Sequence, residues 1–265
     1  MKYPVDYCVI ALNEIKPFIK LQFETLTKPN PSINALGNEE FGSFASFHIV
    51  DKETNDGTIE YCRNAIPDIQ IHSLDYYHVQ NRTNIQQPSF WQWDMAYSMH
   101  YAIENCGDSE WTFLTHPDIV YWNPKQFFEG LWKLATDDVG VIWDGGSALI
   151  RRKAFFQSHM GFWPLLNTQC RVAPNGFGYL VNDRDVRFLG TPIIIMGIEA
   201  GELFRMEMSL LGWSVLFMPY SISKLKEHTG GSTMHDINMD NPNDRNLWNS
   251  KMALVHSRLE GYGGI

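Results

Sequence analysis

The first 75 residues alternate short apolar runs with amphipathic or polar segments, and this alternation restricts the fold most. Residues 6–12 (DYCVIAL) form a continuous apolar run of strand length, typical of a strand buried on both faces of a parallel sheet. Residues 15–26 then carry apolar side chains at helical spacing. A second strand, a short helix and a third strand are predicted at residues 44–50, 58–63 and 68–74. We therefore expect a β-α-β-α-β unit with parallel strands and right-handed crossovers, an α/β fold.

The pattern continues through the middle of the chain. Helices are predicted at residues 89–105 and 124–134, on either side of a short aromatic strand at residues 111–114. Residues 139–143 and 147–150 predict a strand pair around Asp144-Gly145-Gly146, a hairpin-type turn. A helix is expected from the Glu199–Glu202 segment to about Leu211, where Gly212 ends it, and a last strand at residues 213–219.

Polar side chains follow several of the predicted strands at the point where each strand ends. Asn13, Asp51 and Asp118 all lie just past the carboxyl end of a strand. In open α/β sheets, ligands bind in the crevice outside these carboxyl ends. The sequence therefore predicts a ligand site at this edge of the sheet.

The turn after the aromatic strand carries a candidate metal-binding pair. His116 and Asp118 flank Pro117, which stiffens the turn because its ring fixes φ. Separated by one residue in an extended backbone, the imidazole and the carboxylate can converge on one cation, and this donor set suits Mn²⁺ or a related divalent ion. The alternative is a polar pair that only caps the turn.

Composition narrows the class of protein. The chain has 265 residues with 44% hydrophobic and 19% charged residues, values typical of a globular protein. The formal net charge of −9 disfavours a surface that coats a polyanion. The four cysteines are far apart and include no C-x-x-C pair, so reduced thiols are the default. No apolar run reaches the length of a membrane span and no leader pattern begins the chain, so we expect a cytoplasmic protein.

Five segments, in chain order, resemble those of the GT-A glycosyltransferases, most closely the family 2-like members. Residues 50–58 (VDKETNDGT) are similar to the V-D-x-x-S-x-D-G-T signature of that family. Residues 113–118 (FLTHPD) resemble its strand followed by D-x-D, with His116 in place of the first acid. The other segments are the strand ending in Asn13-Glu14, residues 141–152 and Glu199-Ala-Gly-Glu202-Leu before a helix.

The resemblance extends over about residues 5–235 and implies a GT-A fold, a Rossmann-like, mixed but mostly parallel sheet flanked by helices in a single domain. It divides residues 1–235 into a nucleotide-sugar-binding half (1–122) and an acceptor and catalytic half (123–235). Residues 236–265 are then a C-terminal tail that packs on the domain.

The resemblance also implies an activity, the transfer of a sugar from a nucleotide-sugar donor to a hydroxyl acceptor. The implied donors are UDP- or GDP-sugars, and the implied mechanism is inverting. The implied ligands of Mn²⁺ or Mg²⁺ are His116, Asp118 and His228. The implied contacts to the donor come from Asn13, Asp51, Asp56 and Arg152. Glu199 or Glu202 is the implied base that deprotonates the acceptor, which could be a glycan, a lipid-linked sugar, a protein or a modified nucleic acid.

Each of these residues also has a purely structural interpretation. Asp51 and Asp56 could cap a turn and the following helix, and Glu199 and Glu202 are acids of a kind favoured in a first helical turn. His228 could be an ordinary loop histidine, and Arg152 part of a solvated basic patch. Two other functions stay open: a non-catalytic carbohydrate- or nucleotide-sugar-binding protein, in which Ala200 marks a lost acid, and a nucleotidyltransferase.

Overall fold

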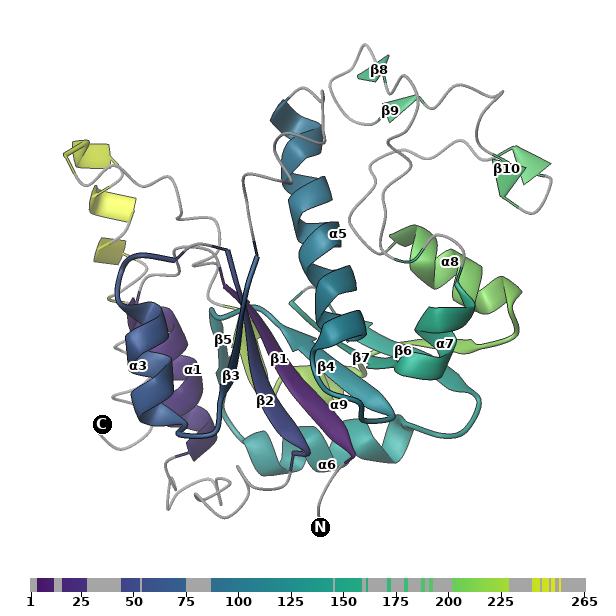
Figure 1. The fold of residues 1–265 in the computed structure, drawn as a ribbon, viewed down its shortest axis with the longest axis horizontal. Helices are drawn as coiled ribbons and strands as arrows, with labels where there is room; N and C mark the ends of the chain where they lie inside the picture. The colour runs from purple at the N-terminus through teal and green to yellow at the C-terminus, as the bar shows by residue number, and fades with distance from the viewer. Residues whose placement is uncertain are drawn as a thin grey trace.

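A computed structural model gives the arrangement of the chain (Figure 1). The structure describes residues 4–11, 16–27, 44–52, 54–74, 87–144, 146–158 and 202–228, with short pieces at 161, 171–172, 179–180, 187–188, 191–192, 240–243, 245–247, 249–250 and 253. Within these residues no helix is both long enough and apolar enough to cross a membrane.

The centre of the fold is a 7-stranded sheet with the order β12-β6-β7-β4-β1-β2-β3. Its strands are β1 (Val5–Ala11), β2 (Ser46–Asp51), β3 (Gln70–Ser73), β4 (Trp111–Thr115), β6 (Val139–Asp144), β7 (Ser147–Arg151) and β12 (Ser214–Phe217). Strand β7 runs antiparallel to both of its neighbours, and every other pair in the sheet is parallel. The sheet is therefore mixed and mostly parallel, as the sequence predicts.

Several two-stranded ladders accompany the central sheet. Strands β5 (Ile119–Tyr121) and β13 (Lys226–His228) pair antiparallel. The other ladders are formed by β8 (Arg171–Val172) with β9 (Tyr179–Leu180), and by β10 (Arg187–Phe188) with β11 (Thr191–Pro192). The β5–β13 ladder connects two segments that are far apart in the sequence, and it matters for the candidate site.

Helices cover both faces of the central sheet, and Figure 1 shows α1 and α3 on one side and α5, α7 and α8 on the other. The helices are α1 (Lys16–Thr27), α3 (Thr58–Ala65), α5 (Gln87–Asn105), α6 (Pro124–Leu134), α7 (Arg152–Gln157), α8 (Glu202–Leu210) and α9 (Tyr220–Ser223). Side chains of α1, α3, α6 and α9 share one core cluster, and side chains of α5, α7 and α8 share a second.

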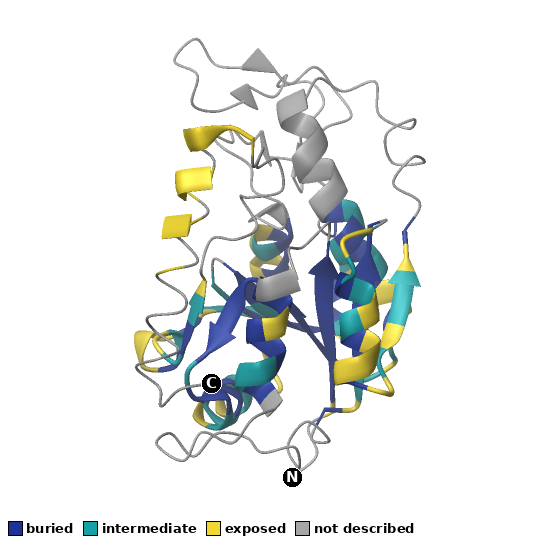
Figure 2. Cartoon of the chain, turned by 90° about the vertical axis from the view of Figure 1, so that its left-hand side faces the viewer, coloured by how far each residue is buried: buried dark blue, intermediate teal, exposed yellow. Residues whose placement is uncertain are grey.

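Strand β1 shows why the sheet is buried on both faces. All of its residues are buried (Figure 2). Tyr7 and Val9 belong to the core cluster on the α1 side, whereas Cys8 and Ile10 belong to the cluster on the α5 side. Because successive side chains of a strand point to opposite faces, a strand covered by helices on both sides is apolar along most of its length.

Local signals set several helix ends. Asn123 caps α6, and its Oδ1 accepts a hydrogen bond from the backbone N–H of Gln126 at 3.0 Å, while Pro124 occupies the first helical position. Gly212 follows α8 with φ at +86°, the left-handed conformation that glycine adopts at the end of a helix. The bounds of α6 and the end of α8 near Leu211 are thus confirmed.

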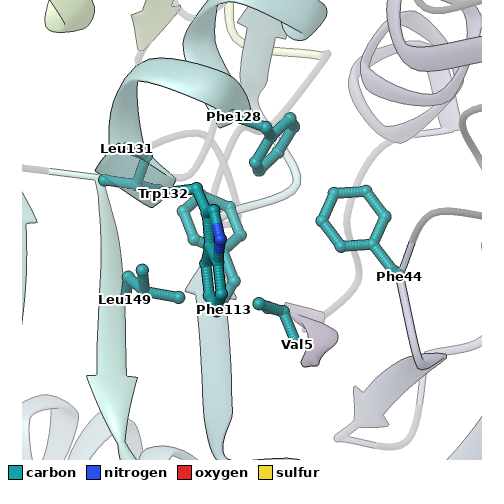
Figure 3. Close-up of a pocket in the computed structure, with 7 residues that line it drawn as sticks. All are labelled: Val5, Phe44, Phe113, Phe128, Leu131, Trp132 and Leu149. Atoms are coloured by element: carbon teal, nitrogen blue, oxygen red, sulfur yellow. The ribbon is translucent and has the colours of Figure 1, made fainter. Parts of the chain in front are cut away.

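A small cavity lies in the core on the α6 side (Figure 3). Its volume is about 10 Å³, close to the smallest space that holds one water. The lining side chains are Val5, Phe44, Phe113, Phe128, Leu131, Trp132 and Leu149. They offer almost no polar partners for a water or a ligand, so the cavity is a packing void and not a binding site.

Asp6 is a buried carboxylate at the start of β1 whose oxygens are well supplied with donors. Its Oδ2 accepts from the backbone N–H of Ser109 at 2.9 Å, and its Oδ1 accepts from the hydroxyls of Ser109 and Ser46 at 2.8 and 2.5 Å. Gly107 lies against this carboxyl group with φ at +75°, and a Cβ built there would overlap it. A glycine is therefore needed at residue 107 for both space and backbone conformation.

We predict that Gly107→Ala destabilises the protein more than Gly212→Ala does. Both glycines have positive φ, which costs an alanine about 1–2 kcal/mol, but a Cβ on Gly212 would meet nothing within 4 Å. The overlap with Asp6 should add about 1–3 kcal/mol to the loss at Gly107. Urea unfolding of the two variants measures the difference, and equal losses would contradict the packing argument.

Candidate metal centre

The His116–Asp118 turn lies at the carboxyl end of β4 and is held by its backbone from two sides. The N–H of His116 donates to the carbonyl of Gly146 at 3.2 Å, and its carbonyl accepts from the side-chain amide of Gln22 at 2.6 Å. Gln22 belongs to α1 and Gly146 to the β6–β7 hairpin. Helix α1 and the β6–β7 hairpin therefore fix the position of this turn.

The β5–β13 ladder brings His228 to the same place. In this antiparallel pair His228 lies opposite Ile119, the residue after Asp118. Nε2 of His228 is 3.1 Å from Oδ2 of Asp118. The structural interpretation of His228 as an ordinary loop histidine is wrong, because His228 is the last residue of strand β13 and its backbone is held by the ladder.

The structure thus brings together the three residues that the sequence predicts as metal ligands. The ligand atoms of His116, Asp118 and His228 all lie within 4.8 Å of one another. The ring centroids of the two histidines are 5.6 Å apart, and the ring planes are inclined at 64°. Asp118 is fully buried, His116 is half-buried, and the side chain of His228 is 36% exposed. The cluster therefore opens to solvent on the His228 side.

The protonation of His116 fits a metal ligand. Burial lowers its pKa to about 4, against the opposing effect of the Asp118 carboxylate. At neutral pH the ring is therefore uncharged, and neutral imidazole is the form that binds metals. Two imidazole nitrogens and one carboxylate oxygen suit a divalent ion such as Mn²⁺, Fe²⁺ or Zn²⁺.

Two lysines add positive charge beside the cluster. Lys52 follows β2, Lys226 begins β13, and both side chains are buried. Both charges act to lower the pKa of His116. Lys226 forms an ion pair with Asp144 at 2.7 Å, and burial lowers the pKa of this lysine while Asp144 and Asp118 oppose the shift. The two lysines therefore place positive charge beside the cluster, and Lys226 is held in position by Asp144.

Lys52, Lys226 and Asp144 are site residues that the sequence does not predict. Two weak signals were present. Lys52 directly follows Asp51 at a strand end. Lys226 is two residues from His228, so the side chains of Lys226 and His228 lie on one face of the same strand. The pairing of Lys226 with Asp144 joins β13 to the β6–β7 hairpin and has no local sequence signal.

Gly146 allows the hairpin to approach the cluster. A Cβ at this residue would come within 2.7 Å of Cδ1 of Ile119 and 3.5 Å of Cγ of His228. A larger residue would therefore push against both strands of the β5–β13 ladder. Asp144 closes the same hairpin, because its Oδ1 accepts from the backbone N–H groups of Gly146 and Ser147 at 3.2 and 3.1 Å.

The two acids predicted to contact the donor nucleoside lie near the end of β2. Asp51 is buried and its Oδ1 accepts from the N–H of Thr54 at 2.9 Å. Asp56 is exposed and its Oδ1 accepts from the N–H of Thr58 at 2.9 Å, at the start of α3. Both therefore perform the turn-forming roles of the structural interpretation. A contact with a nucleoside stays a prediction.

Three of the remaining predicted residues are described only in part or not at all. Asn13 and Glu199 lie outside the described residues, as does the side chain of Glu202. Glu202 begins α8, and one turn later the guanidinium of Arg205 lies 3.4 Å from the ring centre of Trp143, the residue before Asp144. The first turns of α8 therefore lie beside the carboxyl end of β6.

Arg152 lies at the other edge of the sheet. It follows Arg151, which pairs with Trp111 at the amino end of β4, whereas the candidate ligands follow the carboxyl end of that strand. Its guanidinium donates to the carbonyl of Ile103. The structure does not bring Arg152 to the metal cluster, because β7 runs antiparallel to β4 and carries the chain away from it.

Comparisons with known proteins identify the fold. No protein-family model and no curated protein sequence matches the chain. Among solved structures it is similar to a mannosyltransferase, PcManGT from Pyrobaculum calidifontis, in complex with GDP-Man and Mn²⁺ (TM-score 0.50, 13% identity, 83% of this chain and 56% of that chain). Others are TarS from S. aureus (TM-score 0.41, 13%, 61% and 50%) and glucosyl-3-phosphoglycerate synthase from Mycobacterium tuberculosis with Mn²⁺ and UDP (0.34, 11%, 57% and 57%).

The chain has the GT-A fold, with a Rossmann-like, mixed and mostly parallel sheet flanked by helices. The likeness to the mannosyltransferase covers little more than half of that protein, and at 13% identity it shows the fold alone. The expected resemblance in fold is confirmed. The fold does not determine the activity, which depends on the residues at the carboxyl edge of the sheet.

We predict that the stability of the metal-free protein falls as the pH is lowered from about 6.5 towards 4. In this interval the unfolded chain binds a proton at His116 that the folded chain does not, because the pKa of His116 is about 4 in the folded state. At ~1.4 kcal/mol per pKa unit, the loss should approach about 3 kcal/mol. Urea unfolding at a series of pH values, in the presence of a chelator, measures this loss of stability. His116→Gln should remove this contribution and leave that of His48, whose pKa burial also lowers to about 4; an unchanged slope would contradict the assignment.

Proposed function

We propose that the chain is a metal-dependent glycosyltransferase that moves a sugar from a nucleotide-sugar donor to a hydroxyl acceptor. The observation that carries this proposal is the cluster of His116, Asp118 and His228 at the carboxyl edge of a GT-A sheet. Ligands bind at this edge in open α/β sheets. The mannosyltransferase of similar fold was solved with GDP-Man and Mn²⁺, and this supports the choice of a divalent metal and a nucleotide-sugar.

In this proposal His116, Asp118 and His228 hold Mn²⁺ or Mg²⁺, and the bound ion neutralises charge on the leaving diphosphate. Lys52 and Lys226 supply further positive charge at the same place. The ion pair with Asp144 keeps Lys226 in a fixed position, so little reorganisation is needed when the diphosphate leaves.

The other roles follow from position along the edge of the sheet. Asp51 and Asp56, with Asn13 before α1, are proposed to hold the nucleoside of a UDP- or GDP-sugar. Glu202, or Glu199 just before it, is proposed to accept the proton of the acceptor hydroxyl in a single, inverting displacement. Residues 1–122 then form the donor half, residues 123–235 the acceptor half, and residues 236–265 a tail.

A thermal-shift panel tests the donor site. UDP-, GDP-, CMP- and dTDP-sugars are added with and without Mn²⁺. A donor present at a hundred times its dissociation constant stabilises the native state by roughly 2.7 kcal/mol, which is a visible shift in Tm. We expect a shift with one nucleotide that depends on the metal. No shift with any nucleotide would contradict the donor site.

We predict that Asp118→Asn lowers metal-dependent cleavage of the donor by at least ~100-fold, because loss of even an outer partner of a metal ligand costs about 10–100-fold. Asp68→Asn is the matched control: Asp68 is an exposed aspartate in the turn before β3, at the opposite edge of the sheet. It should leave the rate unchanged. Release of nucleoside diphosphate is measured with Mn²⁺, Mg²⁺ and Fe²⁺.

Two experimental outcomes would favour other functions. Donor binding without any cleavage or transfer would indicate a nucleotide-sugar-binding protein, in which Ala200 replaces an acid that a transferase needs. Release of pyrophosphate from a nucleoside triphosphate and a sugar phosphate would indicate a nucleotidyltransferase.

A further inference from the structure

A second group of metal-ligating side chains lies on the sheet face that α5 covers. His48 is on β2, His72 is on the edge strand β3, and Cys106 follows the end of α5. Their ligand atoms all lie within 4.8 Å of one another. His48 and Cys106 are buried, and His72 is partly exposed at the edge of the sheet. None of them belongs to the candidate metal centre.

Strand register places the two histidines on one face. His48 lies opposite Gln70 and His72 lies opposite Val50, so the histidines occupy neighbouring strands with an offset of two residues. Side chains two residues apart share a face of a sheet. Nδ1 of His48 is 3.0 Å from Nε2 of His72. Two nitrogen ligands at about 2.0–2.1 Å from a tetrahedral zinc ion lie roughly 3.3–3.4 Å apart, so a small movement makes room for the ion.

Hydrogen bonds fix the tautomer of His48. The Asp6 carboxylate can only accept, so the Ser46 hydroxyl donates its proton to Oδ1 of Asp6 at 2.5 Å. The oxygen of Ser46 then accepts from Nε2–H of His48 at 2.6 Å. Nδ1 of His48 is left with a lone pair, directed towards His72. An imidazole whose second nitrogen donates into a chain ending on a carboxylate is the usual arrangement around a metal-bound histidine.

The His48 ring is neutral, and charges of both signs lie near it. Burial lowers the pKa of His48 to about 4, so its ring is neutral at pH 7. Asp6 places a negative charge near this ring, and Arg152 places an opposing positive charge. The Cys8 side chain hydrogen-bonds with Cys106, and burial raises the pKa of Cys8, which keeps Cys8 a neutral thiol.

We propose that His48, His72 and Cys106 form a second metal site, specific for zinc or another ion that prefers thiolate and imidazole ligands. Sulfur and nitrogen donors select Zn²⁺, whereas Mg²⁺ and Mn²⁺ prefer sites with oxygen ligands. Three protein ligands leave one tetrahedral position for water or an added ligand, and the partly exposed edge at His72 gives access. This site does not depend on the proposed transferase activity.

Cobalt absorption tests the site, because thiolate bound to Co²⁺ gives a charge-transfer band in the near ultraviolet. The titration is made under reducing conditions in Asp118→Asn, so that the first centre does not compete. We expect one equivalent of Co²⁺ with this band, and displacement by Zn²⁺. The band should vanish in Cys106→Ala and persist in Cys62→Ala, in which a buried cysteine of α3 is replaced.

A hydrogen-bonded histidine pair without metal is the competing interpretation. It predicts no charge-transfer band in the folded protein. That result, or a band that survives Cys106→Ala, would overturn the proposal. His72→Gln covers the case in which Cys106→Ala does not fold, since His72 is partly exposed. It should weaken zinc binding at least ~100-fold and abolish the rise in Tm with Zn²⁺. Unchanged affinity would also overturn the proposal.

Discussion

The antiparallel ladder between β5 and β13 is the interaction on which the candidate metal centre depends. It joins the turn after β4 to a segment near the far end of the described chain, and it sets His228 against Asp118 at 3.1 Å. The same three-residue strand carries Lys226 to Asp144. Two paired strands thus determine where a histidine, a lysine and two carboxylates meet, and a slip of one residue would reverse the direction of every side chain.

Charges of both signs lie at this edge of the sheet, and they act on His116 in opposite directions. Burial is the main reason that His116 stays uncharged; Asp118 opposes this effect, and the charges of Lys52 and Lys226 add to it. A neutral imidazole beside a buried carboxylate suits a divalent cation, and the two lysines place positive charge beside it. The proposed substrate, a metal-chelated nucleoside diphosphate sugar, carries both kinds of charge.

Much of the fold could be predicted from the sequence, because its signals are local. The apolar run of β1, the cap at Asn123 and the glycine at residue 212 each act within a few residues. The placement of His228 in a strand and the burial of Lys226 could not be predicted, because β13 has three residues and its partner lies about a hundred residues away. The location of Arg152 at the amino end of β4 could not be predicted either, because it depends on the direction of β7, and that direction is set by pairing within the whole sheet.

The central claim is that one divalent ion binds between His116, Asp118 and His228. Anomalous diffraction at the manganese absorption edge, from crystals grown with Mn²⁺, tests this claim most directly because it locates the ion without reference to activity. We expect one strong peak of anomalous density within bonding distance of a nitrogen of each histidine and an oxygen of Asp118. A peak elsewhere, or a well-ordered Asp118–His228 contact with no peak in saturating Mn²⁺, would contradict it.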